Sequence, residues 1–145
     1  MILGVSAILG AIVIGSAREN PSVTNTIPEA SPVEAAPEQS YEGMVVEIEV
    51  GEKSLMDLRK FKEWAAVLVR AEKEKARAVV FRIDAGKGYV RETEKLMGQV
   101  ANLEVPSYAL IEGTALGAGA LLALSTQTIY VTPESLIGGA GLLAG

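Results

Sequence analysis

Four short runs rich in β-branched and aromatic residues alternate with three longer apolar stretches between residues 44 and 131. The runs read MVVEIEV (44–50), AVVFRI (78–83), SYALIE (107–112) and TIYV (128–131). Short runs of this kind, bounded by glycine, proline or polar clusters, are typical of β-strands. Strands that alternate with helices form right-handed β-α-β units, whose strands lie parallel in one sheet. The sequence therefore predicts an α/β fold of repeated β-α-β units with a mainly parallel sheet.

The first two stretches between the strands have the spacing of amphipathic helices. Residues 54–76 carry one apolar stripe at helical spacing, made of Leu55, Leu58, Phe61, Ala65 and Leu68. Ser54 is the expected N-cap of this helix, with Asp57 in its first turn. Residues 89–102 predict a second helix. The nearly continuous apolar run 78–83 is typical of a strand covered on both faces.

The first 41 residues differ in composition from the rest of the chain. Residues 1–17 carry no charge and are nearly all apolar or small, as in a signal or membrane-anchor segment, although a buried helix would share this composition. Residues 18–41 hold four of the six prolines and four Glu, so we expect a disordered tether there. The folded domain is therefore expected over residues 42–145, which suffices for one core.

The composition excludes several classes of function. The chain has a net charge of -5, and its Lys and Arg are interspersed with Glu, so no basic surface is expected to bind nucleic acid. It contains no Cys and no His, which removes thiolate nucleophiles, imidazole bases and the usual ligands of transition metals. We therefore expect no nucleic-acid partner, no metal and no other cofactor.

Two glycine-rich loops follow expected strands: Asp84–Gly88 (DAGKG) after the second and Gly113–Gly119 (GTALGAG) after the third. Ligands of parallel sheets bind at the carboxyl ends of the strands, where both loops would converge. Backbone N–H groups from two such loops can form an oxyanion hole. The same glycines could instead serve only tight turns and close helix packing. Neither loop has the spacing of a phosphate-binding motif at the first β-α turn.

The segments VVFRIDAGKGYV (79–90) and VPSYALIEGTALGAGALLALSTQTIYVTPESLIGGAG (105–141) resemble the ClpP/crotonase superfamily. The most similar branch is that of the NfeD and signal peptide peptidase A serine proteases, which are membrane-associated. That branch has a Pro-Gly-Gly loop after its Arg-Ile-Asp strand and a Ser-Ala-Gly or Ser-Gly-Gly turn before an apolar helix. The resemblance spans residues 44–141. It implies a ClpP/crotonase-like fold, an extracytoplasmic location at a membrane, peptide or membrane-protein segments as partners, and a homo-oligomer.

The resemblance places Gly117 at the position of the nucleophilic serine, so the hydroxyl that would be acylated is missing. It places the family's general-base lysine beyond Gly145. Ser125 lies at the far end of the apolar helix and Ser135 in a turn signal, so neither is expected to replace the nucleophile. We therefore expect a degenerate member of the protease family, with impaired catalysis.

The backbone donors of the family can persist without the serine. The resemblance assigns the oxyanion-hole amides to Gly88 and Ala118. It also implies a small set of residues lining the site, namely Gly86, Lys87 and Gly119. Lys87 departs from the family pattern, since the family has the first glycine of its Pro-Gly-Gly loop at this position.

The crotonase-like acyl-CoA enzymes are the alternative. Their G-x-A-L-G-G-G turn is close to Gly113–Gly119, and they stabilise a thioester enolate with two backbone amides and no nucleophile. The export-like N-terminus and the lack of an evident acidic catalytic residue after the turn favour the protease-like branch instead. A scaffold without any chemistry in its pocket is the third interpretation.

Overall fold

The computed structural model describes residues 39–139, and all of these except Gln39 belong to one compact unit that begins at Ser40. The expected signal or anchor segment (1–17), nearly all of the expected tether (18–41) and residues 140–145 lie outside the described residues. Among residues 39–139, no helix combines the length and the apolar character needed to cross a membrane.

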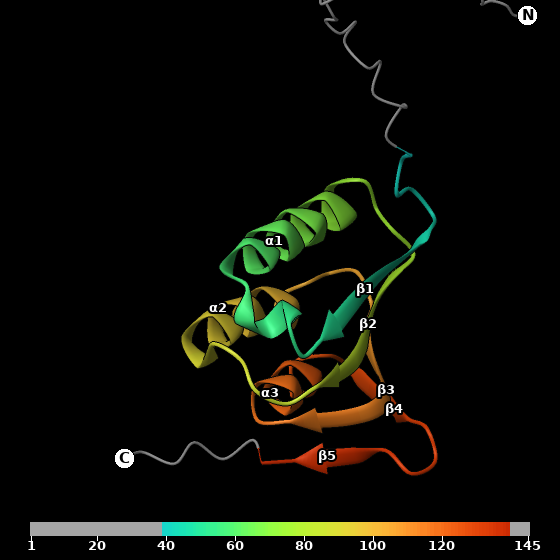
Figure 1. Ribbon diagram of the computed structural model, residues 1–145. Helices are drawn as coiled ribbons and strands as arrows, with labels where there is room; N and C mark the ends of the chain where they lie inside the picture. The colour runs from blue at the N-terminus through green and yellow to red at the C-terminus, as the bar shows by residue number, and fades with distance from the viewer. Residues whose placement is uncertain (1–38, 140–145) are drawn as a thin grey trace, which may run out of the picture. The chain divides into compact units, whose positions relative to one another are not determined.

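Five strands form one sheet in which every pairing is parallel. They are β1 (Val45–Gly51), β2 (Ala78–Ala85), β3 (Ser107–Leu116), β4 (Thr128–Val131) and β5 (Leu136–Gly138). The order is β1-β2-β3-β4, and β5 pairs with the C-terminal part of β3 (Figure 1). The predicted α/β class with a mainly parallel sheet is confirmed. The sequence did not predict β5, because its three residues are too short to form a periodic pattern.

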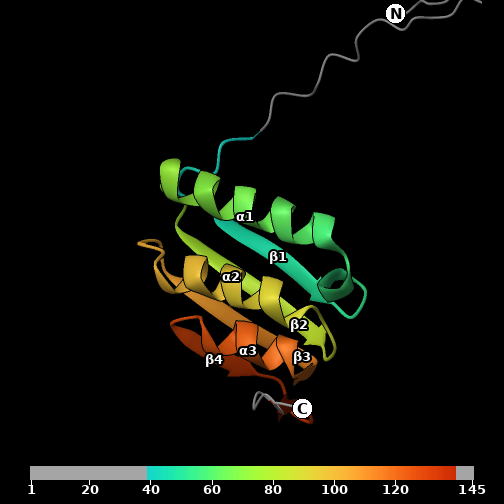
Figure 2. The ribbon, with the colours of Figure 1, turned by 90° about the vertical axis from the view of Figure 1, so that its left-hand side faces the viewer.

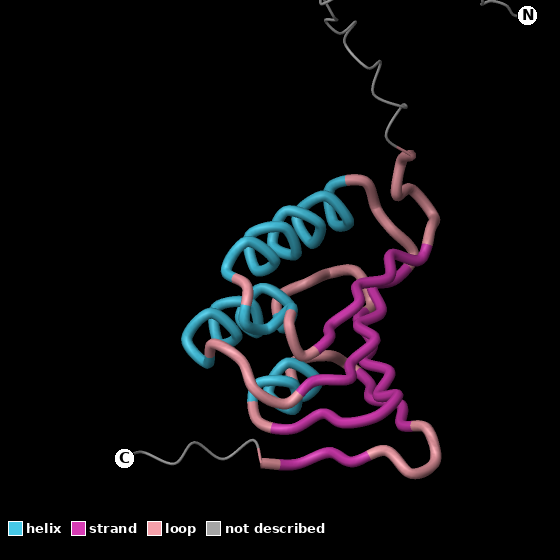
Figure 3. Tube along the Cα trace, in the orientation of Figure 1, coloured by secondary structure: helices cyan, strands magenta, loops and turns pink. Residues whose placement is uncertain are grey.

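The three α-helices of residues 39–139 lie on the same face of the sheet, as Figures 1–3 show. They are α1 (Leu58–Lys73), α2 (Val90–Ala101) and α3 (Ala118–Leu124), and a short 3-10 helix, η2 (Ser54–Met56), precedes α1. The core lies between this face and the helices. Its most completely buried side chains are Leu55, Leu68, Val79, Phe81, Ile83, Ile111 and Leu122. The expectation that residues 78–83 form a strand covered on both faces is wrong, because Val80 and Arg82 point away from the helices and are only half-buried.

The helix α1 begins later than the sequence predicts. Asp57, rather than Ser54, is its N-cap, and the Asp57 carboxylate accepts a hydrogen bond from the backbone N–H of Arg59 at 2.9 Å. The side-chain hydrogen bond from Arg59 also lowers the pKa of Asp57. Ser54 instead opens the η2 turn. An aspartate in the extended conformation before the first turn is a strong N-cap, which explains why the start moved to Asp57.

The later start also changes the apolar stripe of α1. Leu58, expected to face the sheet, is 51% exposed because it is now the first residue of the helix. Phe61 and Leu68 are buried as predicted, and Ala65 is half-buried. Trp64, which the stripe omitted, is buried against Phe61 with an edge-on ring contact of 5.4 Å between centroids.

The described chain contacts the folded unit before residue 42, where the domain was expected to begin. The backbone N–H of Tyr41 donates to the Glu74 carboxylate at 2.6 Å. The guanidinium of Arg70 lies 4.2 Å from the centre of the Tyr41 ring and also binds Glu74. These contacts attach Tyr41 to the C-terminal end of α1.

Candidate functional site

Gly117 forms a sharp turn between the end of β3 and the start of α3. Its backbone has φ 50° and ψ -116°, a combination that L-residues adopt only under strain. Its N–H donates to the carbonyl of Gly138 in β5, and its carbonyl accepts from Leu121, which closes the first turn of α3. In the α/β-hydrolases, a strained strand-to-helix turn of this kind exposes the nucleophilic serine. Here the residue at the turn has no side chain.

The loop expected over Gly113–Gly119 is mostly strand, which corrects the sequence interpretation. Residues 113–116 continue β3 past an irregularity, after which Ala115 pairs with Ala85 of β2. The Asp84 carboxylate stabilises this irregularity by accepting from the Thr114 N–H at 2.9 Å and the Thr114 hydroxyl at 3.1 Å. A Cβ on Gly113 would collide with that carboxylate. Gly113 therefore serves the strand, and only Gly117 forms the turn itself.

The two predicted amide donors are brought together by close backbone packing. A Cβ on Gly88 would lie 2.9 Å from the Ala118 Cβ and 2.7 Å from the Leu55 Cβ. Leu55 is fully buried, and its carbonyl accepts from the Tyr89 N–H at 3.0 Å. Such distances leave no space for a methyl group. A glycine is therefore required at position 88, where the loop between β2 and α2 meets η2 and α3.

One predicted donor already has a partner within the described chain. The Ala118 N–H donates to the Gly86 carbonyl at 3.1 Å. The Gly86 N–H in turn donates to the Glu52 carboxylate at 3.3 Å. A ligand oxygen that binds the Ala118 N–H must therefore displace the Gly86 carbonyl. The assignment of Gly88 and Ala118 as oxyanion donors stays a prediction.

An open groove of about 490 Å³ borders the turn at Gly117. Its lining includes the predicted Gly86, Lys87, Gly88, Gly117 and Ala118, together with Glu52, Val90, Thr114 and Leu116, which the sequence interpretation missed. Glu52 follows Gly51 at the carboxyl end of β1. The rule that the carboxyl ends of parallel strands share one edge could have identified it.

The predicted Gly119 and the two serines lie away from this groove. Gly119 is buried against β2, where a Cβ would lie 3.1 Å from the Ala85 carbonyl carbon and closer still to its oxygen. The Ser125 hydroxyl donates to the Leu122 carbonyl at 2.6 Å, within the last turn of α3. The Ser135 hydroxyl donates to the Ile111 carbonyl at 3.0 Å, beyond the end of β4. Neither serine is in the lining of the groove.

Comparison with known proteins gives one family and several solved structures. The family described as NfeD1b, N-terminal domain, matches residues 45–145. A mutant of the 1510-N membrane-bound stomatin-specific protease, solved with a substrate peptide, superposes with a TM-score of 0.56 at 16% identity, covering 66% of this chain and 44% of that chain. A second mutant of the same protease gives a TM-score of 0.57 at 16% identity, covering 66% and 47%.

A candidate enoyl-CoA hydratase from Streptomyces coelicolor A3(2) superposes with a TM-score of 0.54 at 20% identity, covering 72% of this chain and 51% of that chain. The chain thus spans about half the length of these solved structures. No curated protein sequence matches it. A protease and a crotonase both superpose on the described fold, which confirms the predicted ClpP/crotonase type.

Proposed function

Because the chain belongs to the NfeD1b N-terminal domain family, we propose that its folded unit is a degenerate serine-protease-like domain that binds peptide or membrane-protein segments without cleaving them. The observation that carries this proposal is the turn at Gly117, which has the strained geometry of a nucleophile turn and no side chain. Acylation needs an oxygen or sulfur nucleophile at this point, and glycine supplies neither.

The backbone conformation of Gly117 supports descent from a nucleophile turn. Strained φ/ψ combinations of this kind cost about 1–3 kcal/mol for residues other than glycine, and they persist at functional sites where the surroundings fix them. Glycine at this position removes the strain, and the turn persists because β5 and α3 hold Gly117 from both sides. The result is a turn with the shape of a catalytic site and no reactive group.

The groove beside Gly117 supports peptide binding. Backbone forms part of its lining, because Gly86, Gly88 and Gly117 all border it. The Gly86 carbonyl and the Ala118 N–H bond to each other at 3.1 Å, and once separated they could pair instead with the main chain of an extended peptide. Lys87 and Glu52 lie at the same groove and offer opposite charges to peptide side chains. An extended segment bound there would meet the Ala118 N–H once the Gly86 carbonyl has moved.

We further propose that the domain is held at a membrane outside the cytoplasm and forms a homo-oligomer. The apolar composition of residues 1–17 and the membrane-bound protease among the structural neighbours support membrane attachment. Three large apolar side chains near the last strands, Val131, Leu136 and Ile137, are exposed and support self-association. Sedimentation analysis should then show a species larger than the monomer, whereas a monomer at every concentration would reject the homo-oligomer.

Restoring the missing hydroxyl tests the protease lineage. Gly117→Ser places a hydroxyl at the turn, where a Cβ would lie 3.3 Å from the Gly86 carbonyl oxygen, and Gly117→Ala is the matched control, because it carries the same backbone strain without the hydroxyl. Each protein is treated with a fluorophosphonate, and the mass of the peptide containing residue 117 is measured. We expect labelling of Gly117→Ser alone, suppressed by a peptide aldehyde. Turnover is not expected, because an unactivated serine is a poor nucleophile.

A crotonase-like acyl-CoA enzyme is the second possible function that we propose, and the superposition on a candidate enoyl-CoA hydratase favours it. Enzymes of that kind need only two backbone donors at this turn, so glycine at position 117 would be no defect. If Gly117→Ser stays unlabelled while the unmodified chain binds an acyl-CoA saturably, the protease proposal is rejected in favour of this one. If neither occurs, the groove is a scaffold without chemistry.

A further inference from the structure

The face of the sheet opposite the helices is uncovered within the described chain, as Figures 1 and 3 show. Successive side chains of a strand point to opposite faces of the sheet, and the pairing register aligns them between neighbouring strands. Every second side chain of β1, β2, β3 and β4 therefore lies on this open face. The part nearer β3 and β4 is largely apolar, and consists of Val80, Tyr108, Leu110 and Tyr130. Tyr130 is 55% exposed, and its ring lies 6.2 Å from that of Tyr108.

The other part of the open face is acidic. It carries Glu47 and Glu49 from β1, Asp84 and Arg82 from β2, and Glu112 from β3. Arg82 binds Glu112, with one nitrogen–oxygen distance of 3.1 Å, and lies 3.7 Å from Glu47. Four carboxylates against one guanidinium leave a net charge of three negative units. The hydrogen bond from Arg82 lowers the pKa of Glu112, so this carboxylate stays ionised near neutral pH.

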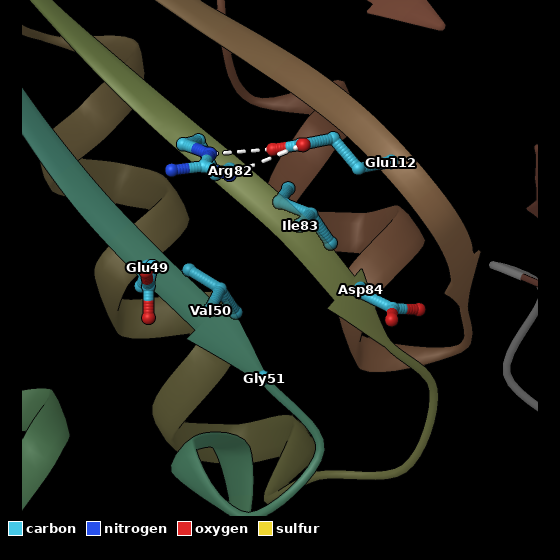
Figure 4. A pocket seen from close by; sticks show the side chains of 7 residues that line it. All are labelled: Glu49, Val50, Gly51, Arg82, Ile83, Asp84 and Glu112. Atoms are coloured by element: carbon cyan, nitrogen blue, oxygen red, sulfur yellow. Dashed lines mark hydrogen bonds and ion pairs between the residues drawn. The ribbon is translucent and has the colours of Figure 1, made fainter. Parts of the chain in front are cut away.

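A shallow hollow of about 240 Å³ lies within the acidic part, near the carboxyl ends of β1 and β2 and beside Glu112 in the middle of β3. Its lining includes the side chains of Glu49, Arg82, Asp84 and Glu112. Figure 4 shows Arg82 and Glu112 extending toward each other from neighbouring strands, while Asp84 lies apart at the end of β2. The open face therefore joins an aromatic and aliphatic surface to a negatively charged hollow.

We propose that this open face docks a cationic amphipathic helix of a partner protein, with aliphatic side chains against Tyr108, Leu110 and Tyr130 and a Lys or Arg in the hollow. The partner approaches a face and not an edge of the sheet, and helices are the elements that usually cover the faces of a parallel sheet. Glu49 lies on β1 and Tyr130 on β4, and these two strands are separated by three strand spacings, or about 14 Å. A helix of about ten residues spans this distance.

Charge selects this occupant over a second copy of the chain. Two copies packed through the open face would bring their surplus carboxylates together, and the whole chain already carries a net charge of -5. A cationic helix instead pairs with the carboxylates that Arg82 leaves uncompensated. This surface lies on the sheet face and does not depend on the chemistry of the groove at Gly117.

The test measures binding of a fluorescent 14-residue Leu/Lys peptide with helical amphipathic spacing to the full chain by anisotropy, and a Leu/Glu peptide of the same pattern is the control probe. Glu49→Lys is paired with Glu94→Lys, an equal change of charge at an exposed position of α2. Tyr130→Ala is paired with Val69→Ala at an exposed position of α1. All four side chains are exposed, so the variants should remain folded, which circular dichroism checks.

We expect Glu49→Lys and Tyr130→Ala each to weaken the Kd for the Leu/Lys peptide by about fivefold or more, and the paired variants to leave it within about twofold. The Leu/Glu peptide should not bind measurably. Equal weakening in both members of a pair would mean diffuse attraction to an acidic protein and would overturn the proposal. Failure of the Leu/Lys peptide to bind, or equal binding of both peptides, would overturn it as well.

Discussion

Gly119→Ala should destabilise the domain because α3 approaches β2 too closely for a methyl group at this position. The added Cβ would lie 3.1 Å from the Ala85 carbonyl carbon, and closer to its oxygen, in a strand that has neighbours on both sides. A main-chain carbonyl in a paired strand cannot move away alone, so α3 must shift from the sheet. Overpacking of this kind costs about 3 kcal/mol, and the better helix propensity of alanine offsets about 1 kcal/mol of it.

The net loss in the free energy of unfolding is therefore about 2 kcal/mol, or a fall in Tm of about 8–16 °C for a domain of this size. Gly98→Ala is the matched control, because Gly98 also lies in a helix, α2, and a Cβ there meets no atom within 4 Å. This variant should raise the stability by about 0.5–1 kcal/mol.

Thermal and urea unfolding followed by circular dichroism measure both changes. Opposite signs for the two glycines are the expected result. If Gly119→Ala were as stable as the unmodified chain, the close packing of α3 on β2 would be refuted. The position of the Gly117 turn would be refuted as well, since that turn directly precedes α3.

Two further predictions concern α1 and the segment attached to it. Phe61→Ala should lower the free energy of unfolding, measured by urea titration, by about 3–5 kcal/mol, because Phe61 is buried. Leu58→Ala should lower it by less than about 1 kcal/mol, because Leu58 is half exposed. Equal losses would contradict the late start of α1. Hydrogen bonds from Arg70 and from the Tyr41 N–H lower the pKa of Glu74 below its ordinary 4.5. The contact between Tyr41 and Glu74 should therefore be fully formed above pH 4.5, and it should be lost as the pH falls through the lowered pKa that Glu74 has in the folded protein. The protection factor of the Tyr41 amide, its exchange rate relative to that of an unprotected amide at the same pH, should fall over that range. In Glu74→Gln it should be low at every pH, and a high, pH-independent protection factor would refute the role of Glu74.

The order of strands and helices could be read from the sequence because it depends on local periodicity. The run TIYV matches β4, and residues 89–102 contain α2 with one residue to spare at each end. Gly117 could likewise be singled out, since a resemblance to a catalytic turn is a matter of residue types in order. Asp57 was also within reach, because an aspartate before an apolar stripe is a known N-cap signal.

The candidate site depends on contacts between distant segments, which periodicity does not encode. Gly88 must be glycine because Leu55 and Ala118 pack against it, and Gly119 because Ala85 does. The hydrogen bond between Ala118 and Gly86 likewise joins the start of α3 to the loop after β2.

The sequence by itself determined the α/β class, the order of the strands along the chain and the choice of Gly117 as the residue of interest, because each of these depends on residues that are close together in the chain. Only the tertiary structure decided that β3 continues through Gly113 to Leu116, that β5 pairs with it, and that one face of the sheet stays open. The physical reason is that strand length and burial are set by what lies across the sheet. For β3 the partners are Ala85 in β2 and Leu136–Gly138 in β5, each at least 20 residues away along the chain.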